Sequence, residues 1–106
     1  MGRLTFGVGL RVDAADRDLA HVHRVMLSKL RRGEGFHFSW KDDMSLGDGR
    51  TTVWVHPDIS LVCRLGRQIS DFNPHWLDEL AIAANSVEGL TFLPEPEAPG
   101  ARKGNS

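Results

Sequence analysis

The 106-residue sequence lacks the features that mark several large classes of protein. A single cysteine, Cys63, excludes an intramolecular disulfide and a cysteine-rich zinc site. No apolar run approaches the roughly 18 residues of a membrane span, and residues 1–12 lack the apolar core of a signal peptide. The formal net charge of −1 argues against a general polyanion binder. These absences predict a cytoplasmic, single-domain protein with no membrane partner.

Most motifs that carry chemistry are also absent. Residues 7–9 begin like a dinucleotide fingerprint, but Val12 stands where the third glycine is needed. No serine lies in a G-x-S-x-G elbow, and no Gly-Lys-Ser/Thr completes a P-loop. His21 and His23 would point about 160° apart on a helix, so they cannot share an ion. The sequence therefore predicts no metal and no cofactor, and each histidine is expected to be a surface or half-buried side chain.

The most suggestive stretch for chemistry is residues 39–50, SWKDDMSLGDGR. A calcium loop that began at Asp43 would need a glutamate at its twelfth position, and none is there. Lys41 begins a sequence close to the Lys-x-Asp-Gly of nucleotidyl transferases, but Met44 replaces the glycine. We interpret the stretch as a loop between strands, in which glycines permit the turn and the charges keep it soluble.

Hydrophobic periodicity predicts the first half of the fold. Alternation in residues 4–12 is typical of a strand, which the glycines at 7 and 9 divide in two. An apolar stripe with helical spacing then predicts a helix that Asp13 or Asp16 caps and that ends at about Arg32. Alternating runs at 36–40, 51–56 and 59–65 predict three strands in an antiparallel meander.

The second half adds a helix and a short strand. Asn73 and Pro74 have the residue types of an N-cap and first helical position, and the buried side of this helix is predicted to reach Val87. The prediction is therefore an α+β fold, with two helices packed on one face of a mainly antiparallel sheet, in the order β(β)-α-β-β-β-α-β. Residues 1–93 form the domain, and residues 94–106, which lack apolar anchors, form a disordered tail.

The charges of the two helices suggest one candidate binding surface. Cations recur every seven residues opposite the apolar stripe of the first helix, at Arg17, Arg24 and Arg31, with Arg32 beside them. The second helix carries acids and no cation, at Asp78, Glu79 and Glu88. Three interpretations are open: phosphate contact by the arginines, pairing of basic on acidic surface, or a solvated helix face without a partner.

Trp54 and His56 form the second candidate. They share one face of the strand at 51–56, opposite Val53 and Val55. If the valines face the helices, Trp54 and His56 lie on the open face, where a partner or a stacked base could contact them. Packing against cross-strand neighbours is the alternative.

Four spaced blocks resemble a family of short actinobacterial proteins of unknown function that also occurs in phages of those hosts. The blocks are MGRLTFG, KLRRGEGFHFSW, GRTTVWVHPDISL and WLDELAIAANSVEGLTFLPEP, and the resemblance extends to Pro96. Members of this family often carry the label ATP-dependent DNA ligase, which implies ATP, Mg and a nucleophilic lysine. A chain of about 100 residues has no room for the two domains of a ligase.

The leading hypothesis is a small non-catalytic cytoplasmic module that binds another protein or a second copy of itself. The alternative is a nucleic-acid-binding accessory protein in DNA metabolism that uses the basic helix face. A ligase-related nucleotidyl transferase with Lys41 as nucleophile is the second alternative.

Overall fold

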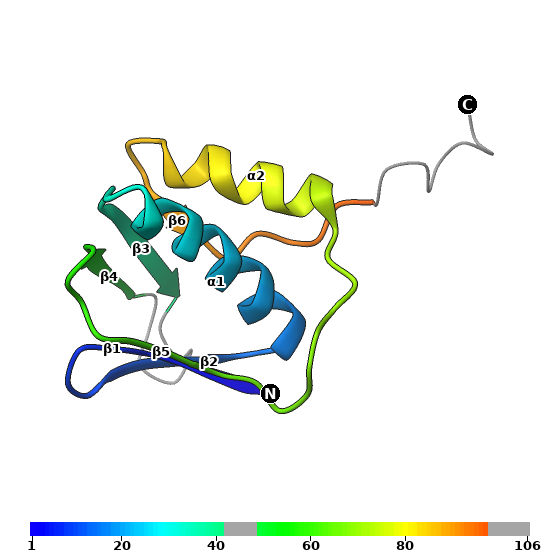
Figure 1. The fold of residues 1–106 in the computed structure, drawn as a ribbon, viewed down its shortest axis with the longest axis horizontal. Coiled ribbons are helices and arrows are strands. Elements are labelled where there is room, and N and C mark those ends of the chain that lie inside the picture. Colours follow the sequence, from blue (N-terminus) through cyan, green and yellow to red (C-terminus); the bar gives the residue numbers. More distant parts are fainter. Residues whose placement is uncertain (42–48, 98–106) are drawn as a thin grey trace.

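The computed structural model describes residues 1–41 and 49–97 (Figure 1). Its elements follow the predicted order, and the predicted α+β fold with two helices and mainly antiparallel strands is confirmed. The elements are β1 Gly2–Phe6, β2 Leu10–Ala14, α1 Asp16–Arg31, β3 Phe36–Lys41, β4 Arg50–Val55, β5 Leu61–Arg64, α2 Pro74–Ala84 and β6 Leu90–Thr91. In Figure 1, α1 lies between α2 and the sheet that contains β1, and β3, β4 and β6 lie behind it.

The strands of the described residues form two three-stranded sheets. Sheet A has the order β2-β1-β5 and is antiparallel throughout. Sheet B has the order β4-β3-β6, in which β6 runs parallel to β3. The predicted meander is therefore wrong at its third strand, because β5 leaves β4 and pairs with β1, with Leu61 opposite Phe6. Alternation identifies a strand and its buried face, but it does not identify the neighbouring strand.

Glycine makes the reversal between β1 and β2. Gly7 and Gly9 have φ values of 57° and 91°, which other residues rarely adopt. The Gly7 amide also donates to the Ser60 carbonyl at 2.7 Å and so joins this turn to the start of β5. The predicted division of the first apolar run into two strands is confirmed.

The first helix follows its apolar stripe, but its predicted cap is wrong. The N-cap is Ala15, which makes no side-chain capping bond. The Asp16 carboxylate instead accepts a hydrogen bond from the Gly66 amide at 2.9 Å, and this bond lowers the Asp16 pKa. Asp16 therefore attaches the start of α1 to the chain beyond β5. At the other end, Gly33 adopts a φ of 73° after the last turn, as predicted.

The second helix begins as predicted and ends earlier than predicted. The Asn73 side chain accepts hydrogen bonds from the His75 and Trp76 amides, and Pro74 is the first helical residue. The helix stops at Ala84, so Val87 lies beyond it and is exposed rather than buried.

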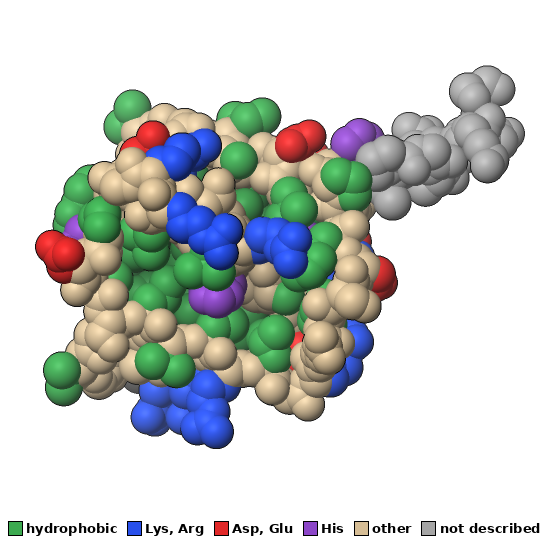
Figure 2. All heavy atoms as spheres, in the orientation of Figure 1, with side chains coloured by type: hydrophobic (Ala, Val, Ile, Leu, Met, Phe, Trp, Pro, Cys, Tyr) green, Lys and Arg blue, Asp and Glu red, His purple; other side chains and the backbone are tan. Residues whose placement is uncertain are grey.

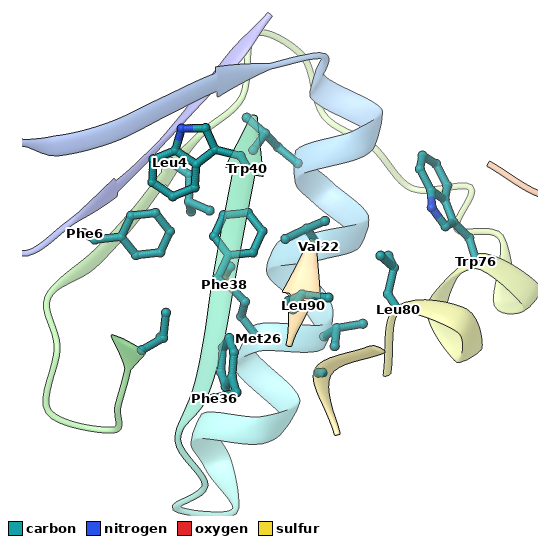
Figure 3. Close-up of a cluster of buried hydrophobic side chains, with 14 residues drawn as sticks. Leu4, Phe6, Val22, Met26, Phe36, Phe38, Trp40, Trp76, Leu80 and Leu90 are labelled. Atoms are coloured by element: carbon teal, nitrogen blue, oxygen red, sulfur yellow. The ribbon is translucent and has the colours of Figure 1, made fainter. Parts of the chain in front are cut away.

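The core lies between the two sheets and the helices (Figure 3). Phe6 of β1 stacks on Trp40 of β3 with ring centroids 5.9 Å apart, and Phe38 tilts against both rings. Val22 and Met26 of α1 close this cluster from the helix side (Figure 3). Trp76, Leu80 and Ala84 bury the inner side of α2.

Candidate functional site

A groove of about 250 Å³ runs between α1 and α2 on the outside of the helix layer. Its lining is Arg24, Val25, Ser28, Lys29 and Arg32 from α1 and its C-cap, and Leu77, Asp78, Ala81 and Asn85 from α2 and its C-cap. The α1 side continues into a second hollow, which Leu27 and Arg31 line together with Arg24. We call the outer surface of these two helices the helix face.

The helix face is divided by charge. Arg24, Arg31 and Arg32 are exposed on the α1 side. The α2 side carries exposed Asp78 and Glu79, and residues 74–84 contain no lysine or arginine. Figure 2 shows basic side chains along α1 and an acidic group over α2. The predicted separation of charge between the helices therefore becomes a basic strip on α1 and an acidic strip on α2, of which Asp78 lines the groove beside Arg24 and Arg32.

Apolar side chains lie among these charges. Leu27 of α1 is 37% exposed and Ile82 of α2 is 71% exposed. Ile82 follows Asp78 by four residues and so lies on nearly the same side of α2. A surface that combines exposed aliphatic groups with charges of both signs has the composition of a small protein interface.

Lys29 fixes the two helices relative to each other at one end of the groove. Its ammonium is almost fully buried, donates to Asn85 Oδ1 at 2.5 Å, and lies 3.0 Å from Glu34. Asn85 is the C-cap of α2, so Lys29 connects the C-terminal ends of both helices. A buried ammonium with two partners of this kind fixes the position of α1 relative to α2, and it is not available to an external ligand.

Arg17, the first predicted arginine, is occupied within the molecule. Its guanidinium donates to both Glu95 carboxylate oxygens, at 2.8 and 2.7 Å, and to the Asp71 carbonyl at 2.9 Å. These bonds lower the Glu95 pKa to about 2. The Arg17 guanidinium is therefore bound within the molecule, and its predicted role in binding a partner stays a prediction.

The same contacts hold residues that we predicted to lie in a disordered tail. Residues 93–97, which we call the C-terminal strap, cross the start of α2 (Figure 1). Asn73 Nδ2 donates to Glu95 at 3.1 Å and to the Pro96 carbonyl at 2.9 Å, and Trp76 Nε1 donates to the Leu93 carbonyl at 3.0 Å. Residues 94–97 therefore pack on the domain, whereas residues 98–106 lie outside the described part of the chain.

His21 lies at the centre of this junction. It is fully buried, contrary to the prediction of a surface or half-buried side chain, and its ring stacks on Trp76 with centroids 4.3 Å apart. Nε2 accepts the Asn73 amide at 2.9 Å, so the proton is on Nδ1, which donates to the Arg17 carbonyl at 2.8 Å. Burial lowers the His21 pKa, and both ring nitrogens are used only when the ring is neutral.

This arrangement predicts a loss of stability in mild acid. The folded His21 pKa lies below its ordinary value of 6.5, so the unfolded chain binds the proton first. The stability that the neutral His21 ring contributes to the fold is complete above pH 6.5 and decreases as the pH falls toward the folded pKa. Urea midpoints measured from about pH 7.5 to about pH 5.5 should fall, and His21→Gln should flatten the profile. Burial lowers the His23 pKa too, so His23→Gln measures how much of the pH dependence of the urea midpoint comes from His23. Equal slopes for wild type and His21→Gln would contradict the assignment.

The remaining predicted arginines are more accessible. Arg24 lies over the Phe72 ring at 3.7 Å, which orients its guanidinium without neutralising it. Arg32 lies 3.5 Å from Glu34, while Arg31 has no ion pair among the described residues. Arg24 and Arg31 are therefore the two cations that the helix face presents most openly.

Trp54 lies on the open face of sheet B, because Val55 is buried on the other side. Its aromatic neighbour is His37 of β3, with centroids 4.9 Å apart, and its ring also covers Gly35. His56 is not part of this group; its Nδ1 accepts the Asp58 amide at 3.2 Å in the turn after β4. The structure thus separates the two residues that the sequence grouped, and Trp54 packs on a cross-strand neighbour while it stays half exposed.

The exposure of Trp54 gives a simple measurement. Trp54 is 53% exposed, whereas Trp40 and Trp76 are 8% and 2% exposed. Iodide should therefore quench mainly the Trp54 fluorescence, and Trp54→Phe should remove most of the quenchable signal. Trp40→Phe is the matched control and should leave that signal in place. If the quenchable fraction of the fluorescence survived Trp54→Phe, the Trp54 side chain would have to lie in the interior.

Lys41 ends β3 and is exposed. It lines a pocket of about 400 Å³ that also contains Asp13, Asp18 and Arg50. Asp13 is bound by Arg3, and Arg50 donates to Ser39 and Thr91. The predicted loop at residues 42–48 lies outside the described residues.

The sequence predicted an unreactive cysteine and no metal site, and the structure places Cys63 as follows. Cys63 is half buried against the core, and burial raises its pKa, which keeps the thiol protonated. Among residues 1–41 and 49–97, no three His, Cys, Asp or Glu side chains gather as a metal site would require. In the same part of the chain, neither helix has the length and apolar character of a membrane span.

A basic group that the sequence reasoning did not assign lies on the outer face of sheet A. Arg3, Arg11 and Arg64 are all exposed there. The signal was present for the first two, since alternation in residues 3–11 places both arginines opposite the apolar side chains. Arg64 joins them only because β5 pairs with β1, which the sequence did not predict.

The fold and its surfaces define a small α+β domain with a charge-divided helix face. Residues 1–95 match the family DUF7882, a domain of unknown function, and the chain belongs to this family. The match agrees with the predicted membership of a small family of unknown function; the actinobacterial origin and the ligase label stay predictions. Comparison with curated proteins and with solved structures gives no match.

Proposed function

We propose that the domain is a non-catalytic binding module that pairs with a second copy of itself through the helix face. The observation that supports this proposal is the charge division, with Arg24 and Arg31 on α1 and Asp78 and Glu79 on α2. A twofold axis over the groove would place α1 of one copy on α2 of the other. Each basic strip would then meet an acidic strip, twice per dimer.

The size of the helix face indicates a weak complex. The 16 residues of α1 make a helix about 24 Å long, and two adjacent helices are about 20 Å wide. The resulting area of roughly 500 Å² per copy is below the roughly 800 Å² of a standard interface. We therefore expect dissociation constants in the micromolar range or weaker, with Leu27 and Ile82 buried between the copies.

Charge reversal tests the proposal in a way that loss of folding cannot imitate. Sedimentation at up to several hundred micromolar protein should show a dimer that dissociates as salt is added. Arg24→Glu/Arg31→Glu and Asp78→Lys/Glu79→Lys should each be monomeric, because every strip then meets a strip of its own sign. A mixture of the two variants should form a heterodimer, because both contacts are again complementary. Thermal melts of each variant alone serve as the folding control.

Two outcomes would overturn the proposal. One is a wild-type monomer at the highest concentration in low salt. The other is a reversed variant that dimerises as well as the wild type, which would place the interface elsewhere. The nucleic-acid alternative through the helix face is weaker in this structure, because Arg17 is bound by Glu95 and the acidic Asp78 lines the same groove as Arg24 and Arg32.

A further inference from the structure

The outer face of sheet A carries an ordered group of cations. The strand register places Arg64, Arg3 and Asp13 in one row across the sheet. The next row on the same face contains Val62, Thr5 and Arg11. Figure 2 shows basic side chains gathered on the side of the molecule where β1, β2 and β5 lie. This surface is made by strands that are distant in the sequence, and it is independent of the helix face.

The face is cationic even after its internal ion pair is counted. Arg3 binds the Asp13 carboxylate with two hydrogen bonds, at 2.7 and 3.2 Å. Arg11 and Arg64 have no ion pair within residues 1–41 and 49–97. Three arginines and one aspartate on these two rows leave a net charge of +2. The whole chain has a net charge of −1, so this concentration of positive charge is local.

The spacing of the arginines suits a row of phosphates. Neighbouring strands are about 4.8 Å apart and residues rise about 3.4 Å along a strand, so the Arg11 and Arg64 Cα atoms are about 12 Å apart. One strand of a duplex presents a phosphate about every 3.4 Å along the axis, so this distance spans several phosphates. The arginine fork matches phosphate oxygens in pairs, which a lysine does not. A shallow hollow of about 500 Å³ lies at the Arg3–Arg64 end, with Asp13 also in its lining.

We infer that the outer face of sheet A binds the sugar–phosphate backbone of nucleic acid without reading its bases. The described residues of the two rows include no aromatic side chain for stacking and no amide for base edges. Binding therefore depends on phosphate charge and responds strongly to salt. Sheet A and α2 lie on opposite sides of α1 (Figure 1), so a dimer through the helix face would leave both sheet A faces free.

The test compares two variants of equal charge. Fluorescence anisotropy with a labelled 20-mer, single-stranded or duplex, should show binding at low salt, with a log–log salt slope between about −1.4 and about −2.7 for two to three phosphates. Arg11→Glu should weaken binding at least about threefold, and Arg11→Glu/Arg64→Glu at least about tenfold. Lys41→Glu changes the net charge by the same amount as Arg11→Glu, but at the end of β3, and should change the affinity less than about twofold. Thermal melts confirm that all three variants fold.

Three results would overturn the inference. The first is no binding to either oligonucleotide in low salt. The second is an equal loss in Arg11→Glu and Lys41→Glu, which would mean that overall charge and not this face is responsible. The third is binding to anionic phospholipid vesicles without binding to nucleic acid, which would assign the face to a membrane surface. These results are separate from dimerisation, because Arg11 and Arg64 lie outside the helix face and Arg11→Glu/Arg64→Glu should sediment like the wild type.

Discussion

Replacing Gly89 with alanine is expected to destabilise the domain by about 3 kcal/mol. Gly89 has a φ of 84°, where a Cβ is strained, and an added Cβ would lie 2.7 Å from the backbone oxygen of His37. The oxygen cannot move without shifting β3, which carries Phe36, Phe38 and Trp40 into the core. The expected result is a large fall in the urea midpoint with an unchanged m-value.

Gly33→Ala is the matched control for this substitution. Gly33 has a similar φ of 73°, but no atom of residues 1–41 or 49–97 lies within 4 Å of an added Cβ. It should therefore cost only the backbone strain, about 1 kcal/mol. The difference between the two variants measures how closely the chain before β6 approaches β3. Equal costs at the two positions would contradict the close contact.

Asn73→Ala is the second substitution with a large expected effect, about 2–3 kcal/mol. The side chain is buried, caps α2 through its oxygen, and holds the C-terminal strap through its nitrogen. Alanine removes both functions and leaves the helix amides and the Pro96 carbonyl without their partner. Thermal or urea unfolding measures the loss.

Asn73→Ser separates the two functions. Serine is a good N-cap, but it has no amide to donate to Glu95 and Pro96. We expect about half the cost of the alanine variant. If Asn73→Ser were as stable as the wild type, the hydrogen bonds to the strap would contribute nothing. If it were as unstable as Asn73→Ala, the cap would contribute nothing.

The elements of this fold could be read from the sequence because their signals are local. The apolar stripe of α1, the Asn-Pro start of α2 and the glycines between β1 and β2 each act within a few residues. The pairing of β5 with β1 could not be read, since an alternating strand fits any edge that buries its apolar side. That single pairing turns the predicted meander into two sheets.

For the candidate surfaces too, the sequence predicted local features, but it did not predict contacts between residues that are far apart along the chain. The seven-residue spacing of arginines correctly placed Arg24 and Arg31 on the outside of α1. It could not show that Arg17 is bound by Glu95, because that partner is 78 residues away. The buried state of His21 depended in the same way on Trp76, which approaches it only in the folded chain.

The position of the C-terminal strap has a consequence for the rate at which the protein unfolds. Its anchors come from both helices, so it can dock only after α1 and α2 have packed together. Contacts that form late in folding chiefly slow unfolding and have little influence on the speed of folding. The last described residues of the chain therefore act on the lifetime of the native molecule more than on the time it takes to form.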